Sequence, residues 1–363
     1  MVGYGMEPCL TDDGAKSHNC VYLRGVYLLY ERHAIAQHPD FIDLTFRKLE
    51  KCLAGLGNCA FRHLPPKKLP LMGTAIGQPR GGMGLLGINL FDSADVYQDG
   101  EAEQALGRAI ASLPRQSVVL ATKCFFPMSE RPNDRGLSRK HIVASVEGSL
   151  RRLGTDFLDL HQCHRFDPET PLEETVRAYE DLIRQGKVLY WGVSHWTGDQ
   201  ISDACAVADR IGAYRPVSNQ PEYSMLAREI ENDLLAKSER QGLSQIVFSP
   251  LGQGALTGKY SGGRVPERSR ANDPKRNRWM GDTLDAERLA RIDQLQPFAD
   301  ELGISRAQLA LAWCLRKPTI ASVIVGATRL EQLEENVKSV GVIVPPEIER
   351  GIDEIFPARG HHV

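Results

Sequence analysis

The chain has 363 residues, of which 42% are hydrophobic and 25% are charged. This composition is typical of a globular protein, and the length suffices for one large α/β domain or two ordinary ones. The net charge of −2 provides no basic surface for nucleic acid, and no apolar run reaches the length that spans a bilayer. The first residues lack a basic segment followed by an apolar core, so no secretory signal and no membrane insertion are expected.

The eight cysteines contain no C-x-x-C pair. In a chain of this length they indicate reduced thiols in the cytoplasm, not a disulfide framework. His161, Cys163 and His164 are close in sequence, which raises the alternative of a metal site. On an extended strand, however, His161 and His164 point to opposite faces, so we expect no metal there.

The region 1–87 shows no clear unit of strand followed by helix, although 41–56 has a helical pattern and 67–74 resembles a short strand. Within it, GMGLLG at 82–87 matches the dinucleotide pattern G-x-G-x-x-G. That motif needs a strand before it and a helix after it. Here the apolar run at 88–91 follows the motif, so a Rossmann nucleotide site is not expected.

From residue 88 onward, short apolar runs alternate with longer segments of helical period, as in parallel strands that are covered on both faces. Strands are predicted at 88–91, 118–122, 157–160, 188–193, 216–219, 245–248 and 322–325. Helices are predicted at 101–111, 138–153, 170–184, 199–211, 229–241, 284–302, 306–315 and 330–340.

Seven such units in series favour an α/β fold of the (β/α)8 TIM-barrel type over an open doubly wound sheet. No change in composition marks a domain boundary within 88–340. The polar, Gly/Pro/Arg-rich segment 258–285 is predicted to be a long loop on the face where such barrels carry their active sites.

Polar side chains follow three successive predicted strands. Asp92 and Tyr97 come after the first, Lys123 ends the second, and His164 follows the third. A buried lysine is costly unless it is paired, so Lys123 is expected to have a partner or a task. The alternatives are that Lys123 reaches solvent, that Asp92 or Asp95 caps a helix, and that Tyr97 and His164 are packing residues.

These four residue types together suit the reduction of a carbonyl group. An ammonium near a tyrosine lowers the pKa of the phenol from about 10, and a carboxylate keeps that lysine charged. A neutral imidazole can donate a hydrogen bond to the carbonyl oxygen. The tyrosine would then protonate the carbonyl oxygen, which gains negative charge as the hydride is transferred.

The chain resembles the aldo-keto reductase family, in the branch that includes potassium-channel β subunits and many bacterial reductases. The segment FDSADVYQDGEAEQALG resembles the family's FDTA-x-x-Y-G-x-x-E-x-x-LG. Further segments follow in the family's order over roughly 88–355: VLATK, DLHQCHRFDPETPLEET, WGVSHW, NQPEYSMLARE, SPLGQGALTGKY and VGATRLEQLEENV. The resemblance implies a catalytic tetrad of Asp92, Tyr97, Lys123 and His164, and it selects Asp92 over Asp95.

The resemblance also implies NADP(H), bound without a Rossmann motif, at residues that follow several strands. These are Ser194, His195 and Gln220 at the nicotinamide amide, Phe248 stacked on the ring, Ser249, Leu251, Gly252 and Lys259 along the pyrophosphate, and Gly326, Thr328, Arg329, Gln332, Glu335 and Asn336 at the adenosine end. Independently of the family, Arg329 beside a helix N-terminus is suited to bind a 2′-phosphate. The alternative is a solvated surface arginine.

The sequence departs from the family in two places. The family usually has Asn at His195 and Tyr or Trp at Phe248, which is expected to alter affinity for the cofactor without abolishing it. The larger departure is at 50–86. The number of residues there matches the family's first strand and helix, but the residues do not show the pattern of a strand followed by an amphipathic helix. We therefore expect an atypical or damaged first βα unit, produced by two compensating frameshifts or by real divergence.

This reasoning divides the chain into an N-terminal extension at 1–45 and a barrel at 46–360. The leading hypothesis is an NADPH-dependent reductase of a small aldehyde or ketone, with Phe125, Phe126, Trp196 and Trp279 lining the substrate pocket. The alternatives are a regulatory subunit similar to channel β subunits, which binds NADPH and a membrane partner, and an inactive product of a frameshifted gene. A homo-oligomer is left open.

Overall fold

The computed structural model describes residues 88–358 except 268, 274–276, 278–279 and 328. Several predictions fall outside these residues. They are the extension at 1–45, the helix at 41–56, the strand at 67–74, the atypical first βα unit at 50–86, the GMGLLG segment, Thr328 and Trp279.

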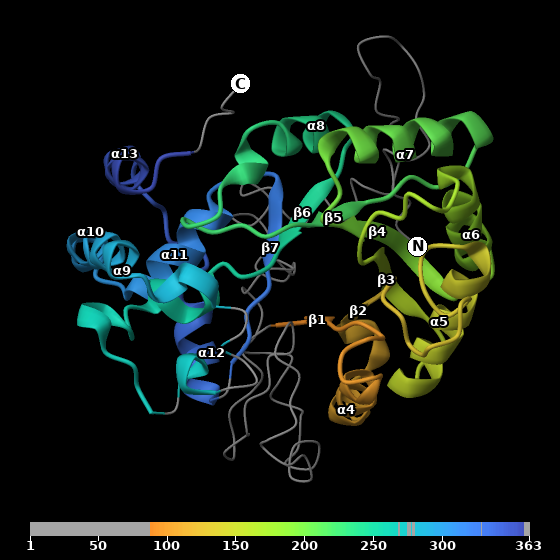
Figure 1. Ribbon diagram of the computed structural model, residues 1–363, viewed down its shortest axis with the longest axis horizontal. Helices are drawn as coiled ribbons and strands as arrows, with labels where there is room; N and C mark the ends of the chain where they lie inside the picture. Colours follow the sequence, from red (N-terminus) through yellow and green to blue (C-terminus); the bar gives the residue numbers. More distant parts are fainter. Residues whose placement is uncertain (1–87, 268, 274–276, 278–279, 328, 359–363) are drawn as a thin grey trace, which may run out of the picture.

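Seven parallel strands form one sheet in strict chain order, β1 to β7. In Figure 1 they follow an arc, with the helices on its outer side. Each predicted strand is present at or close to its expected position. Their bounds are β1 Leu90–Asp92, β2 Val119–Cys124, β3 Leu158–Cys163, β4 Val188–Ser194, β5 Ser218–Gln220, β6 Ser244–Val247 and β7 Ile320–Val323.

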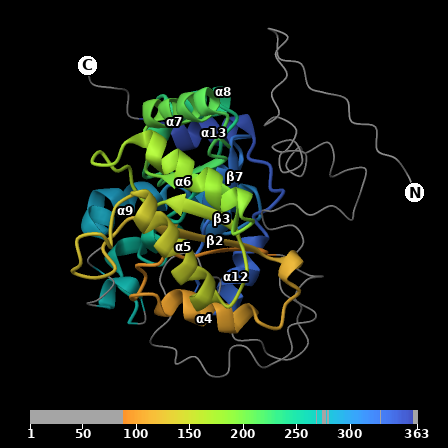
Figure 2. The same ribbon diagram turned by 90° about the vertical axis from the view of Figure 1, so that its right-hand side faces the viewer.

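The helices follow the strands along the chain, and Figure 2 shows α4 to α7 lying side by side along the outside of the sheet. The α-helices are α4 Glu101–Ile110, α5 Arg139–Leu153, α6 Leu172–Arg184, α7 Gly198–Ile211, α8 Leu234–Arg240, α9 Ala286–Asp293, α10 Gln296–Glu301, α11 Arg306–Leu315, α12 Leu330–Val337 and α13 Pro346–Ile355. In the described part of the loop after β6, short 3-10 turns occur between Gly252 and Leu284.

Two predicted helices are divided in the structure. The helix expected at 284–302 is α9 and α10, and Pro297 takes a first-turn position of α10, where its missing N–H costs nothing. The helix expected at 229–241 is a 3-10 turn at Glu229–Glu231 followed by α8. Helix α13 was not predicted. Ser138 caps α5, and its hydroxyl accepts the His141 N–H at 3.3 Å.

The two faces of the sheet have different contents because side chains alternate along a strand. The outer face of β1 to β4 packs against α4 to α7 through residues such as Phe91, Trp191 and Val193. The inner face holds a small apolar layer that includes Ala121 and Leu160. The residues that follow this layer toward the C-terminal ends of the strands are polar, which directs attention to that end.

Helices α4 and α5 approach each other closely at Gly107. A Cβ at Gly107 would lie 2.4 Å from the carbonyl oxygen of Leu153, and backbone cannot move aside as a side chain can. On α5 itself, a Cβ at Gly148 would meet only the guanidinium of Arg152, at 2.9 Å. The two glycines therefore differ in what replacement would cost.

We predict that Gly107→Ala lowers the free energy of unfolding by about 1–3 kcal/mol because it forces α4 away from α5. Gly148→Ala is the matched control, and it should be neutral or stabilising because alanine is the better helix former by about 1 kcal/mol. Urea denaturation measures both. Equal stability of the two variants would show that the helices are not packed this closely.

Candidate active site

The four side chains singled out in the sequence lie at the C-terminal ends of β1, β2 and β3. Asp92 ends β1, Lys123 lies in β2 two residues after the inner-facing Ala121, and His164 directly follows β3. The β1–β2 register pairs Asp92 with Ala121, and the β2–β3 register pairs Ala121 with Leu160. Alternation from these pairs places Asp92, Lys123 and His164 on one face.

Lys123 and Asp92 form a buried ion pair. The Nζ of Lys123 lies 2.5 Å from Oδ2 of Asp92, and it also donates to the carbonyl oxygen of Ser93 at 2.7 Å. Lys123 is fully buried and Asp92 is 2% exposed. Burial alone would lower the pKa of Lys123, but the charges and hydrogen bonds of Asp92 and Tyr97 raise it above its ordinary value. Lys123 is therefore a cation, and it does not extend into solvent.

Tyr97 lies over this pair, and its ring centroid is 5.3 Å from Nζ of Lys123. A turn in which its N–H donates to the carbonyl oxygen of Ala94 (3.1 Å) fixes it in the loop before α4. Burial raises the pKa of Tyr97, and the positive charge of Lys123 offsets this only in part. The expectation that Lys123 would bring the pKa of Tyr97 below its ordinary value was wrong, because desolvation is the larger effect.

His164 faces Tyr97 with its ring edge, at a centroid distance of 5.8 Å, and Phe126 at 4.9 Å. Burial, followed by the positive charges of Lys123 and Arg165, lowers the pKa of His164 to about 2. The imidazole is therefore neutral at physiological pH. Its Nδ1 is buried and has no hydrogen-bond partner in the described part of the chain. His161 points to the other face, where its Nδ1 lies 2.9 Å from the hydroxyl of Tyr179.

Two glutamines complete the surroundings of Asp92. Oδ1 of Asp92 accepts from Nε2 of Gln220 at 2.9 Å and from Nε2 of Gln162 at 3.2 Å. Gln220 was predicted at the cofactor, and its contact with Asp92 was not foreseen. Gln162 was missed, although it is a polar residue inside an apolar strand and pairs in register with Lys123. A polar residue that pairs with a lysine of the neighbouring strand is the signal that could have identified Gln162 as part of the site.

The residues predicted around the nicotinamide lie next to this group. Ser194 Oγ donates to the carbonyl oxygen of Gln220 at 2.8 Å, and the His195 N–H donates to the same oxygen at 3.3 Å. The rings of His195 and Phe248 are 5.0 Å apart. His195 has φ +56°, a conformation that asparagine and histidine adopt more readily than most residues, so the departure from the family's usual residue keeps the backbone conformation accessible.

The loop after β6 carries the residues predicted along the pyrophosphate. Ser249, Gly252 and Gly254 have positive φ angles, and Ser249 Oγ accepts from Gln253 Nε2 at 2.7 Å. Partial burial, followed by the positive charges of Arg270 and Arg329, lowers the pKa of Lys259. The charges of Arg270 and Arg329 therefore both act on Lys259, and Arg270 was not among the predicted residues. Leu251 packs on the core behind them.

The residues predicted at the adenosine end lie at the C-terminal end of β7 and on α12. Gly326 and Arg329 are exposed, and the Arg329 N–H donates to the Gln332 side chain at 3.3 Å. The Glu335 carbonyl oxygen accepts from Gln308 Nε2 at 2.9 Å, and Asn336 is buried. Contacts join Asp92 to Gln220, Gln220 to His195, and His195 to Phe248.

The aromatic residues predicted for the substrate separate into two groups. Phe125 and Phe126 are partly exposed, and their rings are 5.3 Å apart beside His164. Trp196 is 1% exposed and packs edge-on against Phe166, at 4.9 Å. Trp196 therefore packs in the outer core, and its role in the pocket lining stays a prediction.

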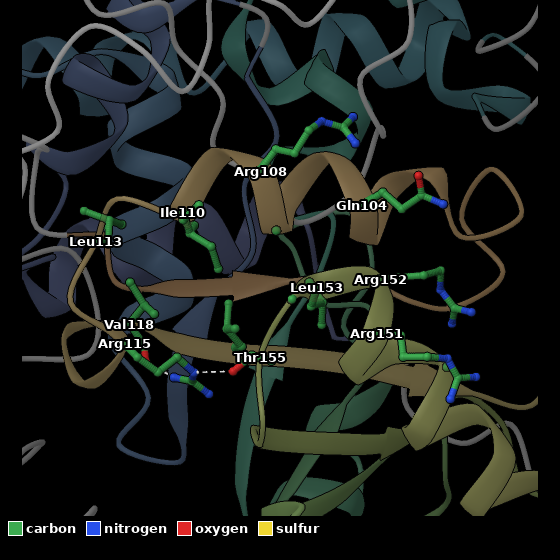
Figure 3. A pocket seen from close by; sticks show the side chains of 15 residues that line it. Gln104, Arg108, Ile110, Leu113, Arg115, Val118, Arg151, Arg152, Leu153 and Thr155 are labelled. Carbon is green, nitrogen blue, oxygen red and sulfur yellow. Dashed lines mark hydrogen bonds between the residues drawn. The ribbon is translucent and has the colours of Figure 1, made fainter.

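A hollow of about 660 Å³ lies elsewhere, between α4, α5 and the start of β2 (Figure 3). It is lined by Val118 and Leu120, which precede Lys123 on β2, so it lies toward the opposite end of the strands from the tetrad. Arg115 hydrogen-bonds Thr155 (3.0 Å) and pairs with Asp159 (2.6 Å) beside it. This hollow is not where the candidate chemistry lies.

Comparison with known proteins agrees with this geometry. Residues 85–355 match the aldo/keto reductase family. The chain belongs to the aldo/keto reductase family. It is similar to proteins named probable voltage-gated potassium channel subunit beta in Arabidopsis thaliana (45% identity) and in rice (42%), each over 278 residues, 75% of this chain and 84% of the relative. It is also 42% identical to a putative voltage-gated potassium channel subunit beta of Schizosaccharomyces pombe, over 75% of this chain and 81% of that protein.

Membership of the aldo/keto reductase family confirms the predicted (β/α)8 barrel, of which the described residues contribute seven strands. No helix among these residues is long and apolar enough to cross a membrane. No cluster of three His, Cys, Asp or Glu side chains in the same part of the chain could hold a metal ion.

We predict that Lys123→Met lowers the free energy of unfolding by about 3–5 kcal/mol, because it leaves the Asp92 carboxylate buried without a cation. Lys187→Met is the control, because the pair of Lys187 with Glu147 is partly exposed and should be worth about 0–1 kcal/mol. Equal losses in urea denaturation would contradict the importance assigned to the buried pair.

Proposed function

We propose that this aldo/keto reductase uses NADP(H) to reduce an aldehyde or ketone to the alcohol, with Asp92, Tyr97, Lys123 and His164 as its catalytic residues. The observation that carries the proposal is the buried Lys123–Asp92 pair, with Tyr97 and His164 placed around it. A buried pair of charges at strand ends is costly to maintain and has a clear use if the neighbouring groups transfer a proton.

In the proposed reaction Tyr97 donates its proton to the carbonyl oxygen. Its raised pKa keeps the hydroxyl protonated throughout the neutral pH range, so Tyr97 carries the proton that it donates. The ammonium of Lys123 stabilises the phenolate that remains, and Asp92 holds Lys123 charged and in place. His164 is neutral and can donate a ring N–H to the same oxygen, which orients the carbonyl. A bound nicotinamide supplies the hydride.

The described residues fit an anionic dinucleotide. Lys259, Arg270 and Arg329 are close enough for the two arginines to lower the pKa of the lysine, and negative charge between them would relieve that repulsion. Arg329 precedes α12, whose N-terminal N–H groups also favour an anion. His195 and Phe248 present neighbouring aromatic rings beside Gln220, which contacts Asp92. We propose that these groups hold NADP(H).

Phe125 and Phe126 support an apolar or aromatic carbonyl substrate, since both are partly exposed beside His164. We also propose that the protein works in the cytoplasm. All four cysteines among the described residues are free and buried, as in proteins of reducing compartments.

Tyr97→Phe tests the proposed acid. The substitution removes only the hydroxyl, so we predict that kcat for reduction of an aromatic aldehyde falls by about 10²- to 10⁴-fold, while NADPH still binds. The decrease in NADPH absorbance measures turnover, and NADPH fluorescence measures binding. Tyr214→Phe, at an exposed tyrosine, is the control and should keep full activity. Full activity in Tyr97→Phe would refute the assignment.

Arg329→Ala tests the choice of cofactor. A charged hydrogen bond to a 2′-phosphate is worth about 1.5–3 kcal/mol, so the Kd for NADPH should rise by about 10- to 100-fold while the Kd for NADH stays unchanged. Arg108→Ala, beside the hollow at the other end of the strands, should affect neither. An equal loss for both cofactors would place Arg329 away from the 2′-phosphate.

A second candidate function rests on the names of the relatives. Proteins 42–45% identical to this chain are named as channel β subunits, which favours a regulatory subunit that binds NADPH and a membrane partner. Recovery of a channel protein with the tagged chain, together with NADPH binding and no turnover on a panel of aldehydes, would favour this alternative. The third alternative, a frameshifted inactive product, is tested by translating the other reading frames over 50–86.

A further inference from the structure

Asp95 is a buried carboxyl group that the proposed reaction does not use. It lies between Asp92 and Tyr97 in the loop that connects β1 to α4, and it is fully buried. It does not cap α4, whose N-cap is Gly100 without a side-chain hydrogen bond. The family resemblance selected Asp92 over Asp95 for the tetrad, and the structure directs the two carboxyl groups to different partners, Lys123 for Asp92 and Ser145 for Asp95.

Asp95 connects the loop of Tyr97 to two other elements. Its N–H donates to the carbonyl oxygen of Lys123 at 3.1 Å, and its Oδ2 accepts from the hydroxyl of Ser145 on α5 at 2.7 Å. Its Oδ1 is buried and has no hydrogen-bond partner among the described residues. A single residue thus ties the loop to the strand that carries Lys123 and to a helix on the outer face.

The groups that face Asp95 provide little compensation for a negative charge. Glu103 on α4 is itself buried and acidic, and its own oxygens accept from Thr122 and Arg152. Cys124 on β2 lies near, and burial raises the pKa of its thiol well above the ordinary value, so it offers no charge to balance a carboxylate. Arg152 on α5 is the cation that acts on Asp95, and its ion pair is with Glu103.

These surroundings favour the neutral carboxyl group. Burial, together with the smaller effect of the Glu103 carboxylate, raises the pKa of Asp95 from 3.8 to about 7, against the opposing effects of the Ser145 hydrogen bond, the Val96 N–H and Arg152. In the unfolded chain the Asp95 carboxyl would ionise with its ordinary pKa of 3.8. Neutral Asp95 is therefore compatible with the fold at acidic pH, and its ionised form opposes the fold increasingly as the pH rises to neutrality.

We propose that Asp95 is a positioning residue whose neutral form holds the Tyr97 loop against β2 and α5, and whose loss of a proton loosens that loop. Tyr97 is two residues away and is fixed by a turn that begins at Ala94. A shift of Asp95 toward solvent would therefore move the Tyr97 hydroxyl away from Lys123. The effect on catalysis depends on the proposed function, whereas the response of the loop does not.

Hydrogen–deuterium exchange of the segment 93–100 tests the loop directly and needs no activity. Asp95→Asn keeps an oxygen that can accept from Ser145 and cannot ionise. After correction for intrinsic exchange, protection of this segment in the unmodified protein should fall relative to Asp95→Asn between about pH 6 and 8. The segment 158–163 in β3 is the internal control and should not change. Equal protection of segment 93–100 in both proteins at every pH would overturn the proposal.

Turnover of an aromatic aldehyde with NADPH provides the second readout. The unmodified protein should lose kcat/KM above about pH 7, whereas Asp95→Asn should match it at pH 6 and keep its activity into the alkaline range. Ser145→Ala removes a hydrogen bond that favours the ionised carboxylate, so it should move the loss to higher pH. A purely structural role would instead lower the activity of Asp95→Asn by the same factor at every pH, which would also overturn the proposal.

The two readouts separate the two hypotheses. If the unmodified protein turns over no aldehyde, the proposed function fails, and the exchange experiment still decides the role of Asp95. If turnover occurs and the pH dependence of exchange is the same in both proteins, the role of Asp95 fails and the proposed function stands.

Discussion

The ion pair between Lys123 and Asp92 is the interaction on which the candidate site depends. Both partners are excluded from water, so each charge is tolerable only because the other is within 2.5 Å and because Asp92 also accepts from two glutamine amides. The pair draws together β1, β2, β3 and β5, which carry Asp92, Lys123, Gln162 and Gln220. The pair places a cation beside Tyr97. The same cation, together with burial, keeps His164 neutral.

The curled parallel sheet explains why this arrangement is possible. Parallel strands in chain order bring their C-terminal ends to one edge, and alternation of side chains assigns polar residues at those ends to the inner face. The outer face is occupied by α4 to α7 and by large apolar residues. Reactive groups can therefore gather on one side while the other side supplies most of the packing that holds the strands.

The same alternation gives the two aspartates of one loop opposite surroundings. Asp92 faces inward to a cation and two amide donors. Asp95 faces outward to Ser145, Cys124 and the carboxylate of Glu103, where a negative charge is poorly compensated. Two identical side chains three residues apart thus have different electrostatic surroundings because their faces differ, and the loop that carries Tyr97 is attached on both sides.

The strands, most of the helices and the inner-face location of Asp92, Lys123 and His164 could be predicted from the sequence, because apolar runs, helical period and alternation are local properties. The tertiary structure decided what depends on distant residues. It split the predicted helix at 284–302, buried Trp196 against Phe166, and placed Arg270 and Arg329 where their charges lower the pKa of Lys259. It also reversed the expected direction for the pKa of Tyr97, because desolvation by the folded chain exceeds the attraction of Lys123, and desolvation cannot be read from a local pattern.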